Sequence, residues 1–441
     1  MRVMPLNLSL YLRKGGMGMK RKRFLGLLLT AMLLVSQSSG CGSKVPDIQE
    51  SDIQKSDIQE SGGSAGSLIE DASTEEPETK EASPDKESLP EPTPAPTPEI
   101  TLVMVGDILL HTPVAESAKT EDGYDFTAVF ANVREEIQDA DLALVNQEVI
   151  IGGTELGISG YPSFNAPFEL GDALNEAGFD VILHATNHTL DKGKRGLLNC
   201  LDFWQENYPE TAVLGIHDSA EDRQEIYVYE QDGIRIAILN YTYGTNGIAL
   251  PDGMPYAVDL LEKDRVIADL QEADEVADFV IVCPHWGTEY VLEETQAQRE
   301  WAQVFADNGA DLVLGTHPHV IEPVEWVDDT LVYYSLGNFV NWTSGTGEGV
   351  ANRMVGGMAR VTVGVDENGK AVITDYGVEP LVCHLEEGFG GVTVYPLGQY
   401  TEQLAERNEI VKQDSSFSLE YCRELSESIF GELAQPESTL R

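Results

Sequence analysis

Residues 101–107 read Thr-Leu-Val-Met-Val-Gly-Asp, an apolar run of strand length that ends in a glycine and an acid. Four later segments repeat this plan, because in each an apolar run leads directly into polar residues. They are 142–148, 181–188, 279–287 and 312–319. In open α/β sheets ligands bind beyond the carboxyl ends of strands, so these five ends predict one shared crevice.

The rest of the folded region alternates in the same way between apolar runs and amphipathic stretches. Strands are predicted at 100–106, 142–146, 180–184, 234–241, 278–283, 311–315, 331–336 and 358–364. Helices are predicted at 127–139, 168–177, 194–206, 259–275, 295–308, 399–412 and 417–433. Buried strands flanked by helices predict an α/β fold whose sheet is covered on its faces. We assign the main domain to residues 100–395 and a C-terminal helical extension to 396–441.

The polar residues at the strand ends are of types that bind metal. Carboxylates, amide oxygens and imidazoles together suit a divalent ion such as zinc, manganese or iron. His317 and His319 are two residues apart on a segment expected to be extended, so their side chains should point the same way. Pro318 favours an extended conformation for His317. The sequence therefore predicts a metal site at this crevice.

The order of the motifs also resembles a known family. Six blocks carry the resemblance: Gly106-Asp107, Asn146-Gln-Glu148, Thr186-Asn-His-Thr-Leu-Asp-Lys-Gly193, His285-Trp-Gly-Thr-Glu-Tyr290, Gly315-Thr-His-Pro-His-Val320 and Ser335-Leu-Gly-Asn-Phe339. They are similar to the bacterial capsule synthesis proteins of the CapA type, which are linked to poly-γ-glutamate. The resemblance implies a metallophosphatase-like fold, in which two sheets stack between helix layers (αββα).

The wider superfamily implies a role for each matching position. It implies that Asp107 and His188 are catalytic, and that His188 acts on the leaving oxygen. The implied ligands of one or two metal ions are Asp107, Glu148, Asn187, His285, His317 and His319. The pattern departs at Leu109, where the superfamily has a histidine, so one of two ions would lack a ligand.

Several neighbouring residues have two interpretations. His111 is either a further ligand or a loop residue, and Asp191 either contacts substrate or orients its loop by a salt bridge. Asn146, Glu289 and Asn338 either support ligands or substrate, or serve in turns. Trp286 and Tyr290 either pack or line a pocket. His184 is predicted to be a core histidine, and His217 and His384 to be solvated loop residues.

The first 41 residues have the layout of an export signal. Four basic residues at 20–23 precede a short apolar run at 24–35, and the segment ends Ser38-Ser-Gly-Cys41. This resembles a secretory signal peptide with a lipobox-like end, in which Cys41 would carry the lipid. Ser38 stands where lipoboxes usually have leucine, and the alternative is an ordinary signal peptide with a bystander cysteine. We predict an extracytoplasmic protein anchored to the cell membrane by lipid.

A linker separates this signal from the folded domain. Residues 42–99 contain a pentapeptide repeated three times, a Gly/Ser patch and a proline-rich end, and they are too polar to form a core. The whole chain has 75 acidic and 28 basic residues, for a net charge of −47. Residues 100–441 alone carry 60 acids and 17 bases. Such a surface repels polyanions and excludes nucleic acid as a partner.

Four cysteines remain after Cys41, and none forms a close pair or a CxxC motif. Cys283 and Cys383 lie in apolar runs and are predicted to be buried thiols.

Two functions are compatible with these features. One is a metal-dependent hydrolase that acts on a phosphoester or amide-type bond of a cell-surface polymer or its precursor. The other is a non-catalytic factor that assembles, exports or anchors the polymer, together with other capsule-synthesis membrane proteins.

Overall fold

The computed structural model describes residues 98–388 and 390–434. The predicted signal, the linker up to residue 97 and Cys41 lie outside this part of the chain. None of the helices in the described part is long and apolar enough to cross a membrane.

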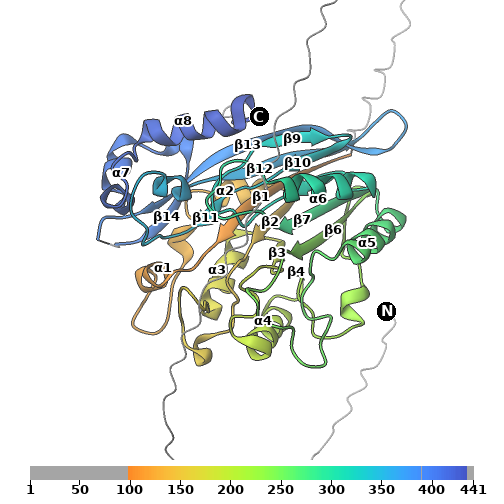
Figure 1. The fold of residues 1–441 in the computed structure, drawn as a ribbon, viewed down its shortest axis with the longest axis horizontal. Coiled ribbons are helices and arrows are strands. Elements are labelled where there is room, and N and C mark those ends of the chain that lie inside the picture. The colour runs from red at the N-terminus through yellow and green to blue at the C-terminus, as the bar shows by residue number, and fades with distance from the viewer. Residues whose placement is uncertain (1–97, 389, 435–441) are drawn as a thin grey trace, which may run out of the picture. The chain divides into compact units, whose positions relative to one another are not determined.

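The described domain contains two β-sheets (Figure 1). The larger has eight strands, with β11 (Asn338–Val340) beside β1 and the others in the order β14 (Val392–Pro396), β13 (Ala371–Leu385), β12 (Val355–Val365), β1 (Glu99–Ile108), β2 (Leu142–Asn146), β3 (Val181–Leu183) and β4 (Ala212–Leu214). The smaller has six, in the order β5 (Val228–Gln231), β6 (Ile234–Thr242), β7 (Phe279–His285), β8 (Leu312–Leu314), β10 (Thr330–Tyr333) and β9 (Val324–Val327).

Alternation along the strands of the smaller sheet shows how the layers stack. In β7, Ile281 and Cys283 belong to the core shared with the larger sheet, and Cys283 Sγ lies 4.0 Å from Met104 Sδ of β1. Val280 and Val282 belong to a second core. Because successive strand residues face opposite sides, one face of this sheet packs on the other sheet and the opposite face packs on helices.

The helices complete the outer layers. The second core is closed by α5 and α6, whereas α2, α3, α4 and α8 contribute to the core of the larger sheet. The helices are α1 (Thr112–Ser117), α2 (Arg134–Asp139), α3 (Phe168–Ala177), α4 (Gly193–Asn207), α5 (Lys263–Val276), α6 (Gln296–Asp307), α7 (Glu402–Arg407) and α8 (Leu419–Phe430). The predicted α/β fold with two stacked sheets between helices is therefore confirmed.

Some elements differ from the prediction. The helix predicted at 399–412 is broken at Asn408, whose side chain accepts a hydrogen bond from Ile410 N and caps a separate 3-10 turn at Glu409–Lys412. The fifteen-residue strand β13 was not predicted, and its first half is partly exposed, so it lacks a continuous apolar run. All four remaining cysteines are free and buried, as predicted for Cys283 and Cys383.

Candidate metal centre

The strand ends bring the predicted ligands together. Asp107 lies at the end of β1, Glu148 and Asn187 follow β2 and β3, and His285 ends β7. His317 and His319 lie on the loop after β8. The larger sheet thus supplies the carboxylates and the amide, and the smaller sheet supplies the three imidazoles.

Gly106 allows the end of β1 to approach the segment before β11 closely. A Cβ atom at this position would overlap the carbonyl oxygen of Gly337, which accepts a hydrogen bond from Asp107 N at 2.9 Å. Only glycine lets the two backbones approach so closely. As a result Asp107 pairs with Asn338 of β11 across the sheet.

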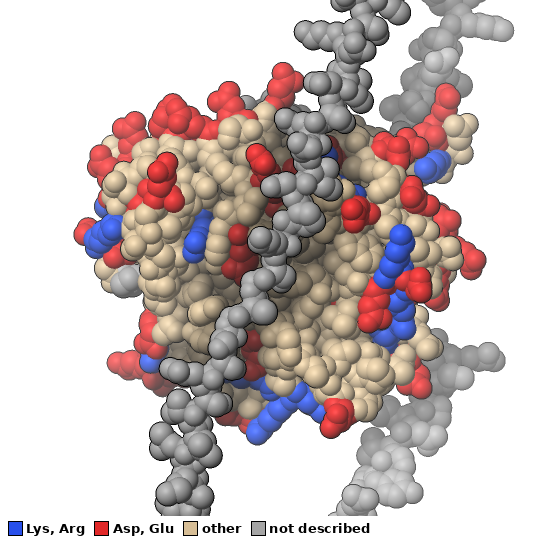
Figure 2. Space-filling view, in the orientation of Figure 1, with Lys and Arg blue, Asp and Glu red and all other residues tan. Residues whose placement is uncertain are grey.

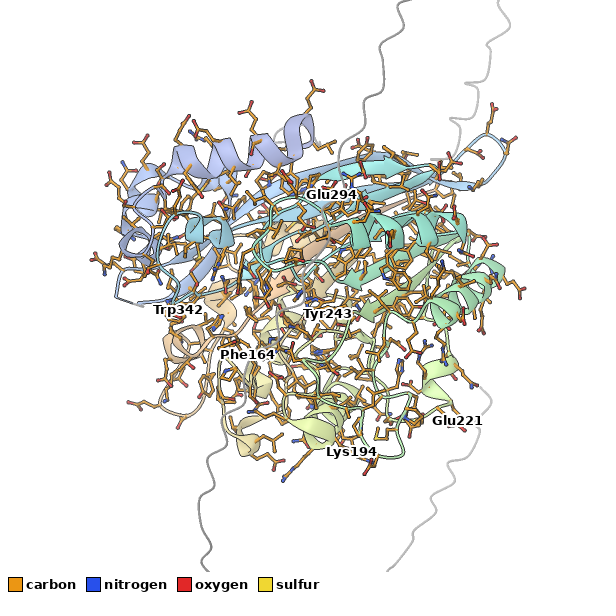
Figure 3. All side chains as sticks on the ribbon, viewed as in Figure 1. Phe164, Lys194, Glu221, Tyr243, Glu294 and Trp342 are labelled. Atoms are coloured by element: carbon orange, nitrogen blue, oxygen red, sulfur yellow. The ribbon has the colours of Figure 1, made fainter. Side chains whose placement is uncertain are left out.

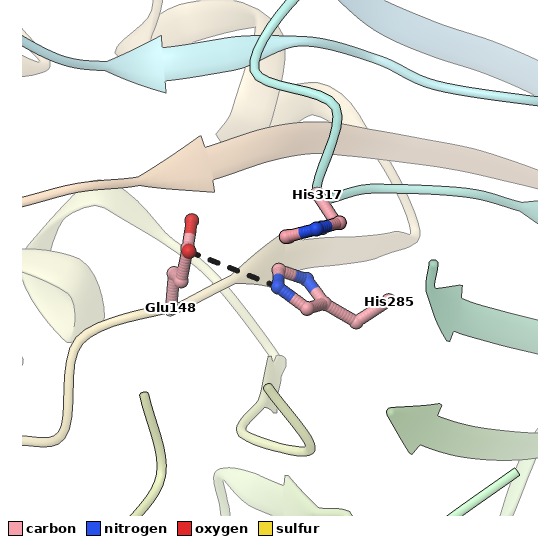
Figure 4. Close-up of side chains that lie close together, drawn as sticks. All are labelled: Glu148, His285 and His317. Atoms are coloured by element: carbon pink, nitrogen blue, oxygen red, sulfur yellow. Dashed lines mark ion pairs between the residues drawn. The ribbon is translucent and has the colours of Figure 1, made fainter. Parts of the chain in front are cut away.

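The ligand atoms form two overlapping groups. Glu148, His285 and His317 form one, and Asp107, Glu148 and His319 form the other; within each group the ligand atoms lie within 4.8 Å of one another. Figure 4 shows the first group, with Glu148 facing the ring of His285 at 3.7 Å. Asn187 joins it, because its Oδ1 lies 3.0 Å from His285 Nε2. Glu148 is common to both groups, as a bridging carboxylate must be.

Several buried polar atoms of the cluster lack hydrogen-bond partners among the described residues. Both carboxylate oxygens of Glu148 and Nδ1 of His317 are buried, and no residue in the described part of the chain forms a hydrogen bond with them, although His319 lies 3.6 Å and His285 3.7 Å from Glu148 Oε1. Leaving a carboxylate buried without partners is costly. A divalent ion between these side chains removes that cost, so the residues present fit a metal.

The electrostatics of the cluster agree. Burial raises the pKa of the Glu148 carboxyl well above its usual value, with Asp107 adding to the effect. Burial lowers the pKa of His285 and of His317, so both are neutral imidazoles, the form that binds metal. Burial alone would lower the pKa of His319 too, but Glu148 and Asp107 outweigh it and raise this pKa to about 9. A divalent ion at this place would favour the ionised carboxylate of Glu148, which burial disfavours.

Further side chains hold the ligands in place. Asn146 Nδ2 donates to Asp107 Oδ1 at 2.8 Å, and Thr316 Oγ1 lies 3.1 Å from His285 Nδ1. Asn338 Oδ1 lies 3.1 Å from His319 Nδ1. Such contacts fix the orientation of metal ligands. Asn146 and Asn338 thus contact two of the proposed ligands, Asp107 and His319.

His188 lies at the edge of the ligand cluster. Its Nδ1 is 2.7 Å from Asp191 Oδ2, and Asp191 also accepts a hydrogen bond from Phe164 N at 2.7 Å. Asp191 therefore orients His188 and its loop. Nε2 of His188 has no hydrogen-bond partner among the described residues, so it is the ring atom left to act on a ligand.

Backbone strain is concentrated at the same place. Six non-glycine residues in the described part of the chain have positive φ, and four of them surround the cluster: Asn246, Tyr290, His317 and His319. The predicted extended conformation of the His-Pro-His segment is wrong, since φ is 99° at His317 and 59° at His319. The reason is tertiary: His317 N points at the Asp107 carboxylate (3.2 Å), and Pro318 O accepts from Tyr290 N (2.7 Å). The turn sends the two imidazoles into different ligand groups.

The other residues singled out in the sequence have the following positions. His111 lies outside both ligand groups, edge-on to Phe164 at 5.1 Å, and burial lowers its pKa to about 4. Glu289 is exposed near the mouth. Trp286 is buried and donates to Tyr334 O at 2.9 Å, so it packs, whereas Tyr290 is 45% exposed. His184 is fully buried, as predicted.

Two histidines predicted to be solvated are buried instead. His217 lies between Asp222 and Asp259, with a ring nitrogen 2.8 Å from each carboxylate. His384 lies on β13 beside the hydroxyl of Tyr400 at 2.9 Å. Their partners are supplied by segments brought close by the fold, which a local sequence pattern does not reveal.

Four residues at the site were missed by sequence reasoning. Thr316 lies between two motif residues and could have been found there. Asn246, Tyr243 and Arg353 come from segments without any motif. Tyr243 stacks near His317 with ring centroids 4.7 Å apart, and Figure 3 shows it near the middle of the view, between Phe164 and the smaller sheet.

Comparisons with known proteins agree with the motif order. Residues 101–343, more than half of the chain, match the family described as "Bacterial capsule synthesis protein PGA_cap". The chain is 35% identical over 176 residues to the PGA biosynthesis protein CapA of Bacillus subtilis (strain 168), a match that covers 38% of this chain and 45% of that protein. It is 28% identical over 258 residues to the capsule biosynthesis protein CapA of Bacillus anthracis, covering 56% and 61%. The matches thus span less than two thirds of either relative.

Among solved structures, the chain is similar to the NAD nucleotidase NadN of Haemophilus influenzae, with a TM-score of 0.40 and 14% identity over 67% of this chain and 60% of that one. From the extent of the family match we conclude that the chain belongs to the bacterial capsule synthesis protein family.

Proposed function

We propose that this protein is a metal-dependent hydrolase that acts at the bacterial cell surface in the synthesis of a capsule-type polymer. The substrate bond would be a phosphoester or an amide-type bond in the polymer or its precursor. The family supports the process, and the ligand cluster supports the chemistry. The observation that carries the proposal is Glu148, whose two buried oxygens have no hydrogen-bond partner in the described part of the chain and face two groups of ligands.

The ligands divide into two positions. Asn187, His285 and His317 with Glu148 would hold one ion, and Asp107 and His319 with Glu148 would hold the other. When bound, divalent ions of zinc, manganese or iron would supply Lewis acidity to the bond being cleaved and lower the pKa of an attacking water. The protein's own task is to hold these ligands still, which Asn146, Thr316 and Asn338 do through the contacts described above.

His188 is positioned to handle the proton of the leaving group. With Nδ1 directed at Asp191, Nε2 can present a proton to a departing oxygen or nitrogen. Asp191 acts as a positioning residue, because it fixes the ring and favours one tautomer without reaching the reacting atoms.

Leu109 supports a second candidate, the non-catalytic factor that assembles, exports or anchors the polymer. This position is a buried leucine where the related metallophosphatases are expected to have a histidine ligand. The group of Asp107, Glu148 and His319 therefore has one ligand fewer, and a protein with one firmly bound ion could use it to hold a polymer without cleaving it.

The setting at the cell surface is part of the proposal. The residues before 98 would provide the export signal, a lipid on Cys41 and a spacer between the membrane and the domain. Other membrane proteins of capsule synthesis would be its partners. Acidic side chains are spread over the face seen in Figure 2 and basic ones are few, so cations would have to screen an acidic polymer as it approaches.

Turnover separates the two candidates. The purified full chain, loaded with manganese, zinc or iron, would be screened against bis(p-nitrophenyl) phosphate and glutamyl peptides. The hydrolase predicts turnover that His188→Ala lowers by about 10²-fold or more, while bound metal is unchanged. Turnover that survives both His188→Ala and Asp107→Ala would contradict the proposed site. Metal binding without any turnover, together with loss of polymer display in Asp107→Ala cells, would favour the assembly factor.

A further inference from the structure

We propose that Arg353 binds an oxyanion of the substrate, a carboxylate or a phosphate group, at the mouth of the metal centre. This inference rests on the proposed function and deepens it, because it names a substrate class for that site. Arg353 belongs to none of the sequence motifs, and it is distinct from the metal ligands.

Arg353 is tied to the centre through its backbone and its side chain. Its carbonyl oxygen accepts a hydrogen bond of 3.0 Å from Asn338 Nδ2, and Oδ1 of the same asparagine contacts His319. Its guanidinium lies 3.5 Å from the centroid of the Tyr290 ring, which in turn is 5.9 Å from the ring of His319. The charge of Arg353 also contributes to the lowered pKa of His111, after burial, His319 and His188. A single aromatic ring thus links the guanidinium to a metal ligand.

The guanidinium is held in place without being neutralised. Its face stacks on Tyr290, and Nη1 donates to Thr343 Oγ1 at 2.9 Å. No carboxylate oxygen of the described residues comes within 4.0 Å of it, although residues 100–441 hold 60 acids against 17 bases. Its Nη2 likewise has no partner in residues 98–388 and 390–434. Stacking uses the face of a guanidinium and leaves its edge to recognise a planar oxyanion.

A nearby carboxylate makes the missing ion pair more informative. Glu289 is exposed, and after burial its charge is the next cause that raises the pKa of the Tyr290 hydroxyl. It nevertheless stays beyond ion-pair distance of Arg353. The strained backbone of Tyr290, with φ of 67°, keeps the ring under the guanidinium. The arrangement leaves a fixed cation for an incoming anion and places an acid beside it that would disfavour loosely fitting anions.

Two exposed aromatic rings lie beside the proposed metal ligands. Tyr243 is 48% exposed and Tyr290 is 45% exposed, one beside His317 and the other beside His319. Exposed aromatic rings beside one fixed cation fit a chain that carries anionic groups.

The test is calorimetric binding of two probes to the metal-loaded full chain: a trimer of glutamate for the carboxylate source and inorganic phosphate for the phosphate source. Arg353→Met should lower the affinity for the probe that Arg353 recognises by about tenfold or more, and Arg353→Lys should lower it less. Arg423→Met, which removes a charge from exposed α8, is the matched control and should change affinity less than twofold. Loss for the trimer alone identifies a carboxylate, and loss for phosphate alone identifies a phosphate.

Metal content measured on the same preparations keeps this inference separate from the proposed function. A wild type without metal would refute the hydrolase, whereas the Arg353 comparison is read from anion affinities alone. Unchanged affinity for both probes in Arg353→Met overturns the inference. An equal loss of affinity in Arg423→Met also overturns it, because that loss would reflect only the overall electrostatic field of the protein. So does a wild type that binds neither probe.

Discussion

Two clusters of histidine and acid in this domain differ in how their side chains are paired. In the first, His217 contacts Asp222 and Asp259, and Arg223 pairs with Asp259 and with Asp269, which also accepts from Tyr241. In the second, the strand-end cluster, Glu148 and His317 keep buried atoms without hydrogen-bond partners among the described residues, and the ion-pair contacts of Glu148 are to His319 at 3.6 Å and His285 at 3.7 Å. The named residues of both clusters are buried, except for Asp222, whose side chain is 51% exposed. The difference is that arginine pairs with acids of the first cluster, whereas the described part of the chain pairs the acids of the second only with imidazoles.

Charge balance draws the same distinction. Asp222, Asp259 and Asp269 face Arg223, Arg265 and a histidine whose pKa is raised: burial would lower it, but hydrogen bonds to Asp222 and Asp259 outweigh the burial. At the metal centre two carboxylates face imidazoles, of which His285 and His317 have lowered pKa values. The acids of the first cluster are paired with arginines and a histidine, whereas those of the strand-end cluster form ion pairs only with imidazoles among the described residues.

The largest expected effect is a loss of stability when the first cluster, around Asp259, is disrupted. Asp259→Asn leaves Arg223 and His217 buried with an uncharged neighbour, so the free energy of unfolding should fall by about 3–5 kcal/mol. Urea unfolding followed by circular dichroism measures this, with metal content as the control. A loss below about 1 kcal/mol would mean that this network is not the structural element described here.

Removing the charge of Glu148 should have the opposite effect on stability. In chelator, Glu148→Gln replaces a buried carboxylate that makes no hydrogen bond to the described residues and forms ion-pair contacts only with imidazoles, so the free energy of unfolding should stay equal or rise by up to about 2 kcal/mol. Metal affinity should drop about a hundred- to a thousandfold, since one shared ligand is lost. Glu322→Gln is the matched control: this carboxylate is equally buried, but its Oε2 accepts a hydrogen bond from Gln298 and only its Oε1 has no hydrogen-bond partner in the described part of the chain. Burial raises its pKa to about 8. If Glu148→Gln is clearly destabilised without metal, the Glu148 carboxylate stabilises the fold by itself, and the difference between the two clusters is wrong.

A smaller effect is expected at Asp191. Asp191→Asn removes the charged partner of His188, and kcat should fall about 10–100-fold while KM and bound metal change less than about twofold. Steady-state kinetics on the substrate found in the screen tests this. Equal losses in kcat and metal content would show that Asp191 only maintains the fold.

The smallest effect concerns pH. Because the pKa of His217 is raised in the folded protein, its protonated form stabilises the fold below the unfolded pKa, and this contribution is lost as pH rises through the folded pKa. His217→Gln should therefore cost about 1 kcal/mol more at pH 5.5 than at pH 9. Unfolding curves at both pH values measure the difference. A larger cost at pH 9 would reverse the assigned sign.

The fold and the ligand cluster were largely predictable because their signals are local. An apolar run followed by Asp107, Glu148 or His285 marks a strand end, and parallel strand ends gather at one edge. The left-handed turn at His317 was not predictable, because Asp107, 210 residues away, binds its backbone N–H. The burial of His217 depends on Asp259, 42 residues away, and Arg353 has no motif around it. Partners distant in sequence decide these features, and a single sequence does not display them.

The central claim is that the strand-end cluster is a metal centre, and elemental analysis tests it most directly. The full chain, purified without added metal, would be measured by plasma mass spectrometry, and then again after incubation with zinc, manganese or iron and removal of excess ion. We predict one to two equivalents of a transition metal per chain, lost in Asp107→Ala and retained in Asp259→Asn. A folded wild type that holds no metal under either condition would contradict the account.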